Sequence, residues 1–377
     1  MMYKRILIVS IAFVVFLLSG CIKDEPLNME ADITAVYLEN GSLITEPLIT
    51  NNSVTIYVKP KEAGSPDYKL KFDLTPGATI ATEVDSVKNF VKPVTYTVTS
   101  QDKQFTKSYL VSVVEITEGF VPSEFDFENV KIDPDGKYHV FYDIMNGQSF
   151  DNWSSGNLGF SISLSVTPGS VKAPESYPTY ATTSSKNGKY AVHMETKLTG
   201  AFGAAFNKPI AAGNLFIGSF DTDDMFANPL QATHFGLPFG KIPVTLEGYY
   251  KYTPGKQVTD LHLKPVNTQD SCDIYAVFYN REALFEETGK SYLDGGNVLT
   301  SKSVVAKAQL KNGGATTADG FTKFSIPFNY IRQYNENDVS QLKYGIALVM
   351  SSSKYGDSFQ GAVGSVLIVD DLQITTK

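Results

Sequence analysis

The only tryptophan of the chain, Trp153, lies in a run of small polar residues. Asn152 and Ser154 flank it, and Asn157 follows closely. An aromatic ring can stack on the apolar face of a pyranose, and amide side chains can hydrogen-bond sugar hydroxyls. Trp153, Asn152 and Asn157 are therefore candidate carbohydrate-binding residues. The alternative is that the sole tryptophan fills the core of the fold.

Acidic residues near both ends of the C-terminal region could hold a calcium ion. Glu128 follows an aromatic-acidic run that begins at Phe125, and Asp370 and Asp371 lie close to the C-terminus. Ca²⁺ prefers about six to eight oxygen ligands. If the first and last strands of this region are neighbours, Glu128 could converge with Asp370 or Asp371 on a structural Ca²⁺. The alternative is that these are edge carboxylates in water.

Glycoside hydrolysis needs two carboxyl groups, one protonated and one ionised, on either side of the scissile bond. Adjacent residues of a strand point to opposite faces, so a neighbouring acidic pair on a strand cannot serve one site. No pair is marked out by the sequence, the catalytic residues stay unknown, and a hydrolase is the less favoured alternative. The acids considered are Asp223-Asp224, Glu286-Glu287, Asp370-Asp371, Glu195 and Glu247.

Other chemistries find little support in the sequence. Phosphate-binding loops, dinucleotide fingerprints and paired-cysteine metal motifs are absent, and the four histidines are scattered. The formal net charge is -8 and no dense Lys/Arg run occurs, which argues against a nucleic-acid partner. Cys272 enters a strand-like run, so we interpret it as a buried structural thiol rather than a nucleophile.

The elements that must position these residues are strands. Tyr and Phe are abundant, at 21 and 24 residues, and short period-two runs recur between turn residues. Residues 31–117 show such runs without a helical pattern, which predicts an immunoglobulin-like β-sandwich. The polar Gly- and Pro-containing segment 117–123 is the best domain boundary. The predicted fold class is therefore all-β.

Residues 124–377 predict a larger jelly-roll β-sandwich. Phe125 to Glu128 is interpreted as its first strand, and Asp133-Pro134-Asp135-Gly136 as the turn of a hairpin. Only Glu282 to Gly289 shows a weak helical pattern. The other predicted strands are Phe160–Val166, Tyr190–Glu195, Asn214–Phe220, Val244–Tyr252, Ile274–Asn280, Ser303–Leu310, Thr322–Pro327, Tyr344–Ser351 and Ser365–Leu372.

The N-terminus is typical of a targeting segment. Lys4 and Arg5 precede an apolar stretch at 6–18, which is too short to span a bilayer comfortably and ends before Cys21. This resembles a bacterial lipobox, in which the cysteine is diacylated, so residues 1–21 would be a lipoprotein signal peptide and 22–30 a tether. The run Lys23-Asp24-Glu25 is similar to the export signal of Bacteroidetes surface lipoproteins. The predicted location is the outer membrane, facing the cell exterior.

The layout resembles Bacteroidetes surface lipoproteins with a putative carbohydrate metabolism domain, in which an immunoglobulin-like domain precedes a jelly roll. The resemblance implies a carbohydrate-related function but supplies no catalytic residues. Its motifs are Phe72 to Ile80, Val94 to Ser100, Phe125 to Glu128, Trp153 to Asn157, and Phe359 to Leu372.

Together these features predict a surface lipoprotein that binds carbohydrate for a glycan-acquisition system. Its partners would be a glycan, the membrane through the lipid on Cys21, and other surface proteins of glycan uptake. Two alternatives stay open. One is a glycoside hydrolase that uses two carboxylates of the jelly-roll domain, and the other is an adhesin or a structural component of a surface assembly.

Overall fold

The computed structural model describes residues 26–41, 43–44, 46–58, 67–82, 90, 92–116, 121–145, 147–166, 173–221, 225, 227–316 and 320–377. The signal segment with Cys21, the run Lys23-Asp24-Glu25 and the pair Asp223-Asp224 lie outside these residues. Within the described residues, no helix is both long enough and apolar enough to cross a membrane.

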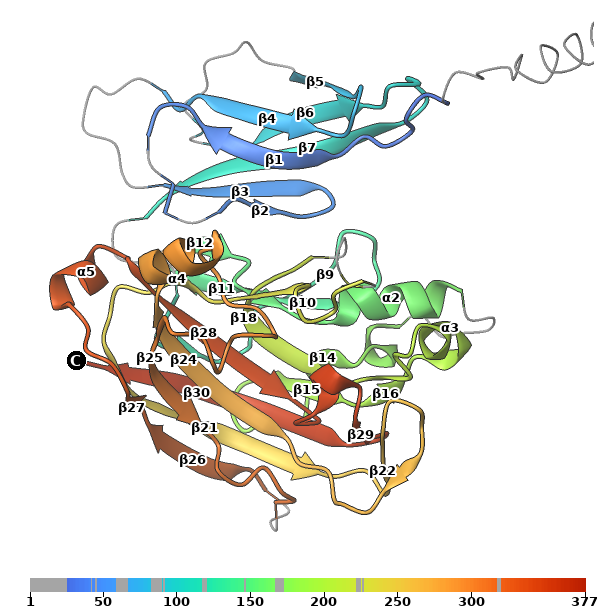
Figure 1. Cartoon of the computed structure of the whole chain (residues 1–377), viewed down its shortest axis with the longest axis vertical. Helices are drawn as coiled ribbons and strands as arrows, with labels where there is room; N and C mark the ends of the chain where they lie inside the picture. The colour runs from blue at the N-terminus through green and yellow to red at the C-terminus, as the bar shows by residue number, and fades with distance from the viewer. Residues whose placement is uncertain are drawn as a thin grey trace, which may run out of the picture. The chain divides into compact units, whose positions relative to one another are not determined.

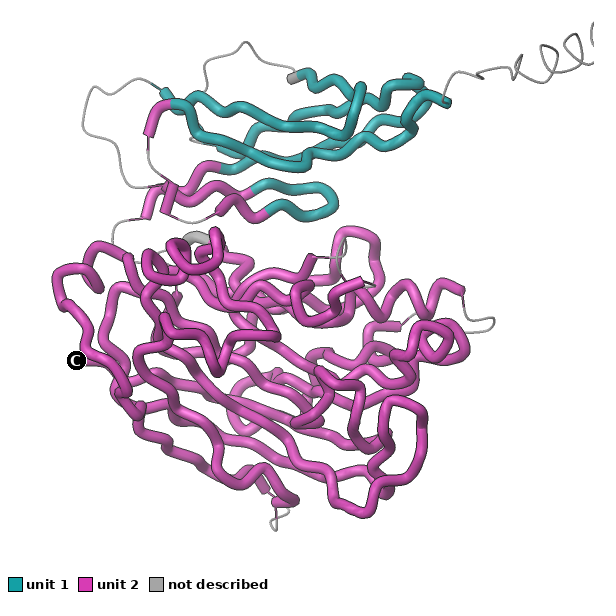
Figure 2. Tube along the Cα trace, in the orientation of Figure 1, with its two compact units in different colours: residues 1–39, 49–54, 67–112 teal, residues 40–48, 55–66, 113–377 magenta. Residues whose placement is uncertain are grey.

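The chain forms two compact units (Figure 2). The smaller comprises residues 1–39, 49–54 and 67–112, and the larger comprises residues 40–48, 55–66 and 113–377. Two segments predicted for the first sandwich, 40–48 and 55–66, thus belong to the larger unit, so the predicted domain limits stay a prediction. Strands dominate both units and helices are few, which confirms the all-β fold class.

The N-terminal strands form two antiparallel sheets. Such an arrangement of short strands is typical of an immunoglobulin-like sandwich. The two-stranded sheet pairs β1 (Ile33–Leu38) with β4 (Leu70–Leu74). The five-stranded sheet has the order β2 (Leu48–Ile49), β3 (Ser53–Val58), β7 (Thr106–Glu115), β6 (Val94–Thr99) and β5 (Thr79–Thr82).

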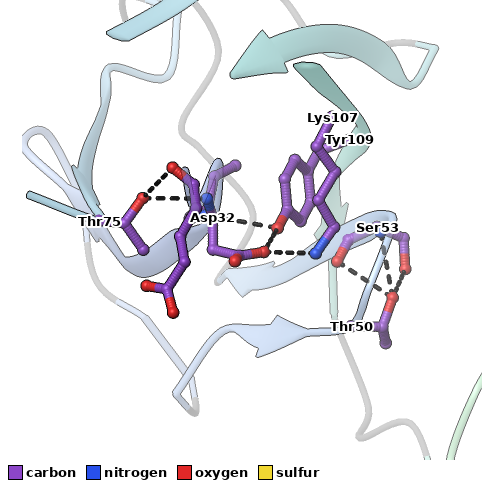
Figure 3. Close-up of polar contacts among 8 residues, drawn as sticks. Asp32, Thr50, Ser53, Thr75, Lys107 and Tyr109 are labelled. Carbon is purple, nitrogen blue, oxygen red and sulfur yellow. Dashed lines mark hydrogen bonds and ion pairs between the residues drawn. The ribbon is translucent and has the colours of Figure 1, made fainter. Parts of the chain in front are cut away.

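A polar cluster around Asp32 fixes the start of β1 in the smaller unit (Figure 3). The Lys107 ammonium and the Tyr109 hydroxyl both donate to the Asp32 carboxylate, the latter at 2.9 Å. The Asp32 amide donates to the Thr75 hydroxyl at 3.2 Å. Burial raises the pKa of Asp32, but the hydrogen bonds from Lys107 and Tyr109 outweigh burial and leave that pKa lowered. The ionised Asp32 carboxylate therefore ties the start of β1 to β7.

The larger unit is built on two antiparallel sheets (Figure 1). The eight-stranded sheet has the order β13 (Trp153–Ser154), β18 (Asn214–Phe220), β28 (Tyr344–Ser351), β24 (Asp273–Asn280), β25 (Val304–Gln309) and β27 (Asn329–Tyr330), with β19 (Thr233–Phe235) on β18 and β20 (Leu237–Pro238) on β28. The six-stranded sheet has the order β14 (Thr179–Thr182), β15 (Ala191–Glu195), β30 (Val366–Thr376), β21 (Pro243–Thr253) and β26 (Thr322–Pro327), with β8 (Glu124–Phe125) on β30.

Short elements connect these sheets. The predicted hairpin is confirmed, because β9 (Val130–Ile132) and β10 (His139–Phe141) pair antiparallel across the Asp133–Gly136 turn. The short strands are β9 (Val130–Ile132), β10 (His139–Phe141), β11 (Asp143–Met145), β12 (Gln148–Phe150), β16 (Lys197–Leu198), β17 (Ile210–Ala211), β22 (Val258–Thr259), β23 (Pro265–Val266) and β29 (Gly361–Ala362). The helical elements are α2 (Asn157–Ser165), η1 (Pro174–Ser176), α3 (Gly200–Ala205), α4 (Arg281–Thr288), α5 (Glu336–Ser340) and η2 (Gly356–Ser358).

The eight-stranded sheet is buried on both faces at its centre. Side chains alternate along a strand, so Leu215 and Ile217 of β18 join the main core while Phe216 joins a second cluster. Tyr275 and Val349 belong to the same second cluster as Phe216. This second face carries the cavity described below.

Of the predicted first strand Phe125 to Glu128, only Phe125 lies in a strand, β8, because Phe127 adopts a left-handed conformation with φ of +56°. A second predicted strand is wrong. Residues Phe160 to Val166 lie mostly in the helix α2. The prediction failed because Leu158, Phe160 and Ile162 alternate with small residues, which is the pattern expected of a strand. The Ser161 hydroxyl donates to the Leu158 carbonyl at 2.7 Å, a bond available only in a helical turn. The predicted helix is confirmed as α4, which has an Asn280 N-cap bonded to the Ala283 amide and ends at Gly289 in the left-handed conformation.

Candidate functional site

Trp153 lies in the core of the larger unit. Its side chain is 4% exposed, and its ring packs edge-on against Phe125, with the two centroids 5.2 Å apart. Its indole N–H donates to the Asp143 carboxylate at 3.1 Å. A ring in this position offers no face to a sugar, so the core alternative describes Trp153 and the stacking role does not fit its placement.

The two asparagines predicted beside Trp153 are buried as well. Asn157 exchanges two hydrogen bonds with the Thr179 backbone, donating at 2.6 Å and accepting at 3.1 Å. Asn152 donates to Asp143 at 2.8 Å. Both amides therefore hold β13 and the start of α2 in place, and neither is open to a ligand. The candidate binding site has to be sought elsewhere in the unit.

The three acids predicted as metal ligands converge on one turn. Glu128 accepts hydrogen bonds from the Lys189 and Tyr190 amides, at 2.9 Å each from Oε1. Asp370 accepts from the Lys186 amide at 2.6 Å, and Asp371 accepts from the Asn187 side chain. The pairing of β8 with β30 brings these distant segments together, as we predicted from neighbouring first and last strands.

This arrangement does not fit a calcium ion. The oxygens of Glu128 and Asp370 face N–H donors, whereas Ca²⁺ needs carboxylate and carbonyl oxygens turned towards one point. Within the part of the chain that the structure describes, no group of three or more His, Cys, Asp or Glu side chains is placed to hold a metal ion. We therefore assign Glu128, Asp370 and Asp371 the role of anchoring the turn at 186–190. Binding of Ca²⁺ stays untested, and the anchoring role predicts that chelation leaves the melting temperature unchanged.

The other predicted acids are dispersed. Glu195 pairs with Lys197 at 3.2 Å, and Glu247 accepts from the Ser325 hydroxyl at 2.8 Å. Glu286-Glu287 lies on the exposed side of α4. None of these acids lines the cavity described next.

A cavity of about 440 Å³ lies on the second face of the eight-stranded sheet. Its floor is formed by β18, β28 and β24 through Phe216, Val349 and Tyr275. Its walls come from the helices α2 and α3, which lie side by side, and from the loops around Leu230, Val298 and Asp357 (Figure 1). A mainly apolar cavity with a few polar groups is the default candidate for a ligand site.

Aromatic rings line the side of the cavity formed by α3. Phe202 and Phe206 are one helical turn apart, with ring centroids 5.1 Å from each other. Phe206 is 45% exposed, so its ring is accessible at the rim. Phe359 also lines the cavity, and the Lys208 ammonium lies 5.7 Å from the centroid of its ring. Half-exposed aromatic rings around a cavity can stack on planar or ring-shaped ligands.

Two carboxylates reach the same cavity. Asp273 begins β24 and is buried, and the Gln309 side chain donates to it at 2.8 Å. Burial raises the pKa of Asp273, and the negative charge of Asp357 adds to that increase. Asp357 is exposed in η2, the short helical turn that follows β28. The cavity thus holds one shielded and one solvated carboxyl group, which could accept hydrogen bonds from ligand hydroxyls.

Sequence reasoning missed these residues because they come from segments far apart in the chain, at 202–208, 273 and 357–359. Asp273 stands directly before a predicted strand, and Phe359 opens the run Phe359 to Leu372, which carries part of the family resemblance. The sequence context of these two positions could have marked them as candidate site residues. Nothing in the sequence indicated that Phe206 or Asp357 would meet them.

Comparisons with known proteins agree with a carbohydrate-related chain. Residues 126–375 match the family described as "Putative carbohydrate metabolism domain", and residues 40–113 match "SGBP, N-terminal". None of the curated proteins matches the chain significantly.

The solved structures that are similar to the chain include two from Bacteroides species. One, from Bacteroides thetaiotaomicron and described as a putative glycoside hydrolase, has 37% identity and a TM-score of 0.83, covering 94% of this chain and 99% of its own. The other, from Bacteroides vulgatus and described in the same way, has 36% identity and a TM-score of 0.60, covering 69% of this chain and 100% of its own.

Proposed function

Because this chain belongs to the family described as "Putative carbohydrate metabolism domain", we propose that it binds carbohydrate in the cavity of its larger unit. The observation that carries this proposal is the pairing of accessible aromatic rings with carboxylates around one cavity. Phe202 and Phe206 would stack on a sugar ring, and Asp273 and Asp357 would accept hydrogen bonds from its hydroxyls.

The proposal includes the cell surface as the place of action. The match of residues 40–113 to "SGBP, N-terminal" supports a cell-surface protein. The lipid on Cys21 would anchor the chain in the outer membrane, facing outwards, and the N-terminal sandwich would act as a spacer. Other surface proteins of glycan uptake would receive the bound glycan.

A glycan array with the chain from residue 22 onward tests the binding proposal. Phe206→Ala and Asp357→Asn change exposed cavity residues, and each should weaken binding of an array hit about tenfold, or about 1.4 kcal/mol. Phe285→Ala is the matched control, because Phe285 is 58% exposed on α4 and does not line the cavity. A glycan that binds all variants equally would place the site elsewhere. No binding to any glycan would favour the adhesin alternative.

Metabolic labelling with an alkyne fatty acid tests the anchor separately. The wild-type chain should incorporate the label and be shaved from intact cells by protease. Cys21→Ala should lose both the label and the membrane association. Label-free wild-type protein in the membrane fraction would contradict the lipoprotein proposal.

Glycoside hydrolysis is the second candidate, favoured by the two carboxylates in one cavity. Protonated Asp273 would give its proton to the leaving glycosidic oxygen, and Asp357 would take a proton from the water that attacks the anomeric carbon. The C–O bond breaks, water adds across it, and a later proton exchange restores both groups. Reducing-sugar release from an array hit, abolished by Asp273→Asn and by Asp357→Asn, would support this candidate. A glycan that is bound but never cleaved would contradict hydrolysis and leave carbohydrate binding as the function.

A further inference from the structure

The cavity differs in character along its length. Strand β18 runs along its floor, and Asn214, Phe216 and Phe220 of this strand all line it. Asn214 and Phe220 are six positions apart, which corresponds to about 20 Å in a strand. The two ends can therefore be compared residue by residue.

The end near Asn214 is polar. Asn214 pairs with Ser351 of β28, and Asp273 of β24 pairs with the same Ser351. The space beside Gly356 is bounded by Ala212 and the Ser351 hydroxyl, so the Gly356-Asp357 segment lies at this end too. The Asn214 amide is already bonded to the Gly156 amide and the Ala212 carbonyl, and the Ser351 hydroxyl donates to the Ser353 carbonyl. The carboxylates of Asp273 and Asp357 are therefore the acceptors that this end offers to a ligand.

The end near Phe220 is apolar. The Phe220 ring and the Met225 thioether methyl both contact the space beside Gly159 of α2. Leu230 packs on Gly295 and is 39% exposed at the rim. The Thr233 hydroxyl, which also lines the cavity, already donates to the Leu230 carbonyl at 3.3 Å.

A sugar ring does not suit the apolar end. A pyranose carries hydroxyls around its edge, and burying a hydroxyl without a hydrogen-bond partner is unfavourable. An alkyl, acyl or aryl group loses unfavourable contact with water there and leaves no polar group unpaired. The two ends together match a ligand that is polar at one end and apolar at the other.

We infer that the cavity selects a saccharide bearing an apolar substituent, with the sugar between Asn214, Asp273 and Asp357 and the substituent between Phe220 and Leu230. The substituent could be an aglycone or an ester-linked acyl group, and both present the same apolar chemistry. This inference rests on the proposed carbohydrate binding in the cavity.

Calorimetry with matched probes tests the inference. The probes are methyl and n-octyl glycosides of glucose, galactose and xylose, kept below the micelle concentration, with 1-octanol as the sugar-free control. At least one octyl glycoside should bind tenfold or more tightly than its methyl counterpart and than octanol, because buried methylene groups add affinity. A 6-O-octanoyl ester of the same sugar distinguishes an acyl from an alkyl attachment.

Two variants locate the effect. Leu230→Asn should remove most of the octyl advantage and leave the methyl glycoside unchanged. Asp357→Asn should weaken both glycosides by a similar factor. Ile331→Asn is the matched control, because Ile331 is 48% exposed and does not line the cavity.

The outcomes separate the two proposals. Equal binding of methyl and octyl glycosides overturns the inference while carbohydrate binding stands. Octanol binding as tightly as every octyl glycoside overturns carbohydrate binding in the cavity. An octyl advantage that survives Leu230→Asn, or the absence of binding by every octyl glycoside, also overturns the inference.

Discussion

The indole nitrogen of Trp153 donates a 3.1 Å hydrogen bond to the carboxylate of Asp143, and both side chains are buried. The same carboxylate accepts from Asn152 at 2.8 Å. The motif predicted as a sugar platform is therefore a polar anchor inside the core. This relationship leads to two predictions that use the sole tryptophan of the chain.

Trp153→Phe should destabilise the larger unit without weakening glycan binding. The variant loses one donor to a buried carboxylate, which costs about 1–3 kcal/mol. Urea unfolding followed by circular dichroism measures the stability, and affinity for an array hit measures binding. Phe206→Ala should show the opposite pattern, with weaker binding and little loss of stability. Loss of affinity in a Trp153→Phe variant of undiminished stability would restore the platform hypothesis.

The fluorescence of Trp153 should titrate with Asp143. Burial raises the pKa of Asp143 to about 6, and the hydrogen bonds from Asn152 and Trp153 oppose that rise only in part. The folded state thus holds this proton at pH values where the unfolded state, with an ordinary value near 3.8, has lost it. Stability contributed by the protonated group is full below about pH 4 and is lost as the pH rises through 6.

The expected loss is about 2–3 kcal/mol between pH 4 and pH 7. Trp153 emission of the folded protein should change with a midpoint near pH 6, and the urea midpoint should fall as the pH rises from about 4 to 6. Asp143→Asn is the control, and it should remove this transition from the emission profile. An emission profile that is the same in both proteins would show that Asp143 does not titrate in this range.

Neutralising the turn anchor should destabilise the protein whether or not calcium is present. Glu128→Gln weakens the acceptor for the Lys189 and Tyr190 amides, so the melting temperature should fall. A chelator should leave the wild-type melting temperature unchanged, because these oxygens are directed at N–H groups. A fall of several degrees on chelation, reversed by Ca²⁺, would instead establish the metal.

Gly188→Ala should disturb the same anchor through its side chain. A Cβ at Gly188 would collide with the Glu128 carboxylate, and φ there is +62°. Gly136→Ala is the matched control, since Gly136 has φ of +73° with nothing within 4 Å of the added Cβ. Both variants carry the backbone strain, so a larger loss of melting temperature at Gly188 isolates the contact with Glu128. Equal losses would show that this contact contributes little.

Cys272 should be unreactive in the folded protein. Its side chain is buried, and burial raises the pKa of the thiol. Because the thiolate is the nucleophile, labelling by Ellman's reagent should be slow in buffer and fast in denaturant. The chain from residue 22 onward lacks Cys21, so Cys272 alone is measured. Rapid stoichiometric labelling of the native protein would contradict the structural role.

The sequence by itself determined most of the strands and one helix. The continuous apolar run Tyr344–Ser351 predicted β28, and the alternating run Thr322–Pro327 predicted β26, both with their limits. Alternation follows from strand geometry, and a short apolar run indicates a strand buried on both faces. Asn280 and Gly289 bound α4 through local backbone chemistry. Such features depend on neighbours within a few residues, so they can be read from the chain.

Only the tertiary structure decided the burial of Trp153 and the makeup of the cavity. Trp153 is covered by Phe125, whose strand is held against β30, at the other end of the region. Phe206, Asp273 and Asp357 meet because separate segments pack on one face of a sheet. Residues 157–165 likewise form a helix although their sequence has the period-two pattern of a strand. The bond from Asn157 to the Thr179 backbone, a distant contact, holds the start of this helix. Long-range pairing sets these features, and a single sequence does not record which distant segments pair.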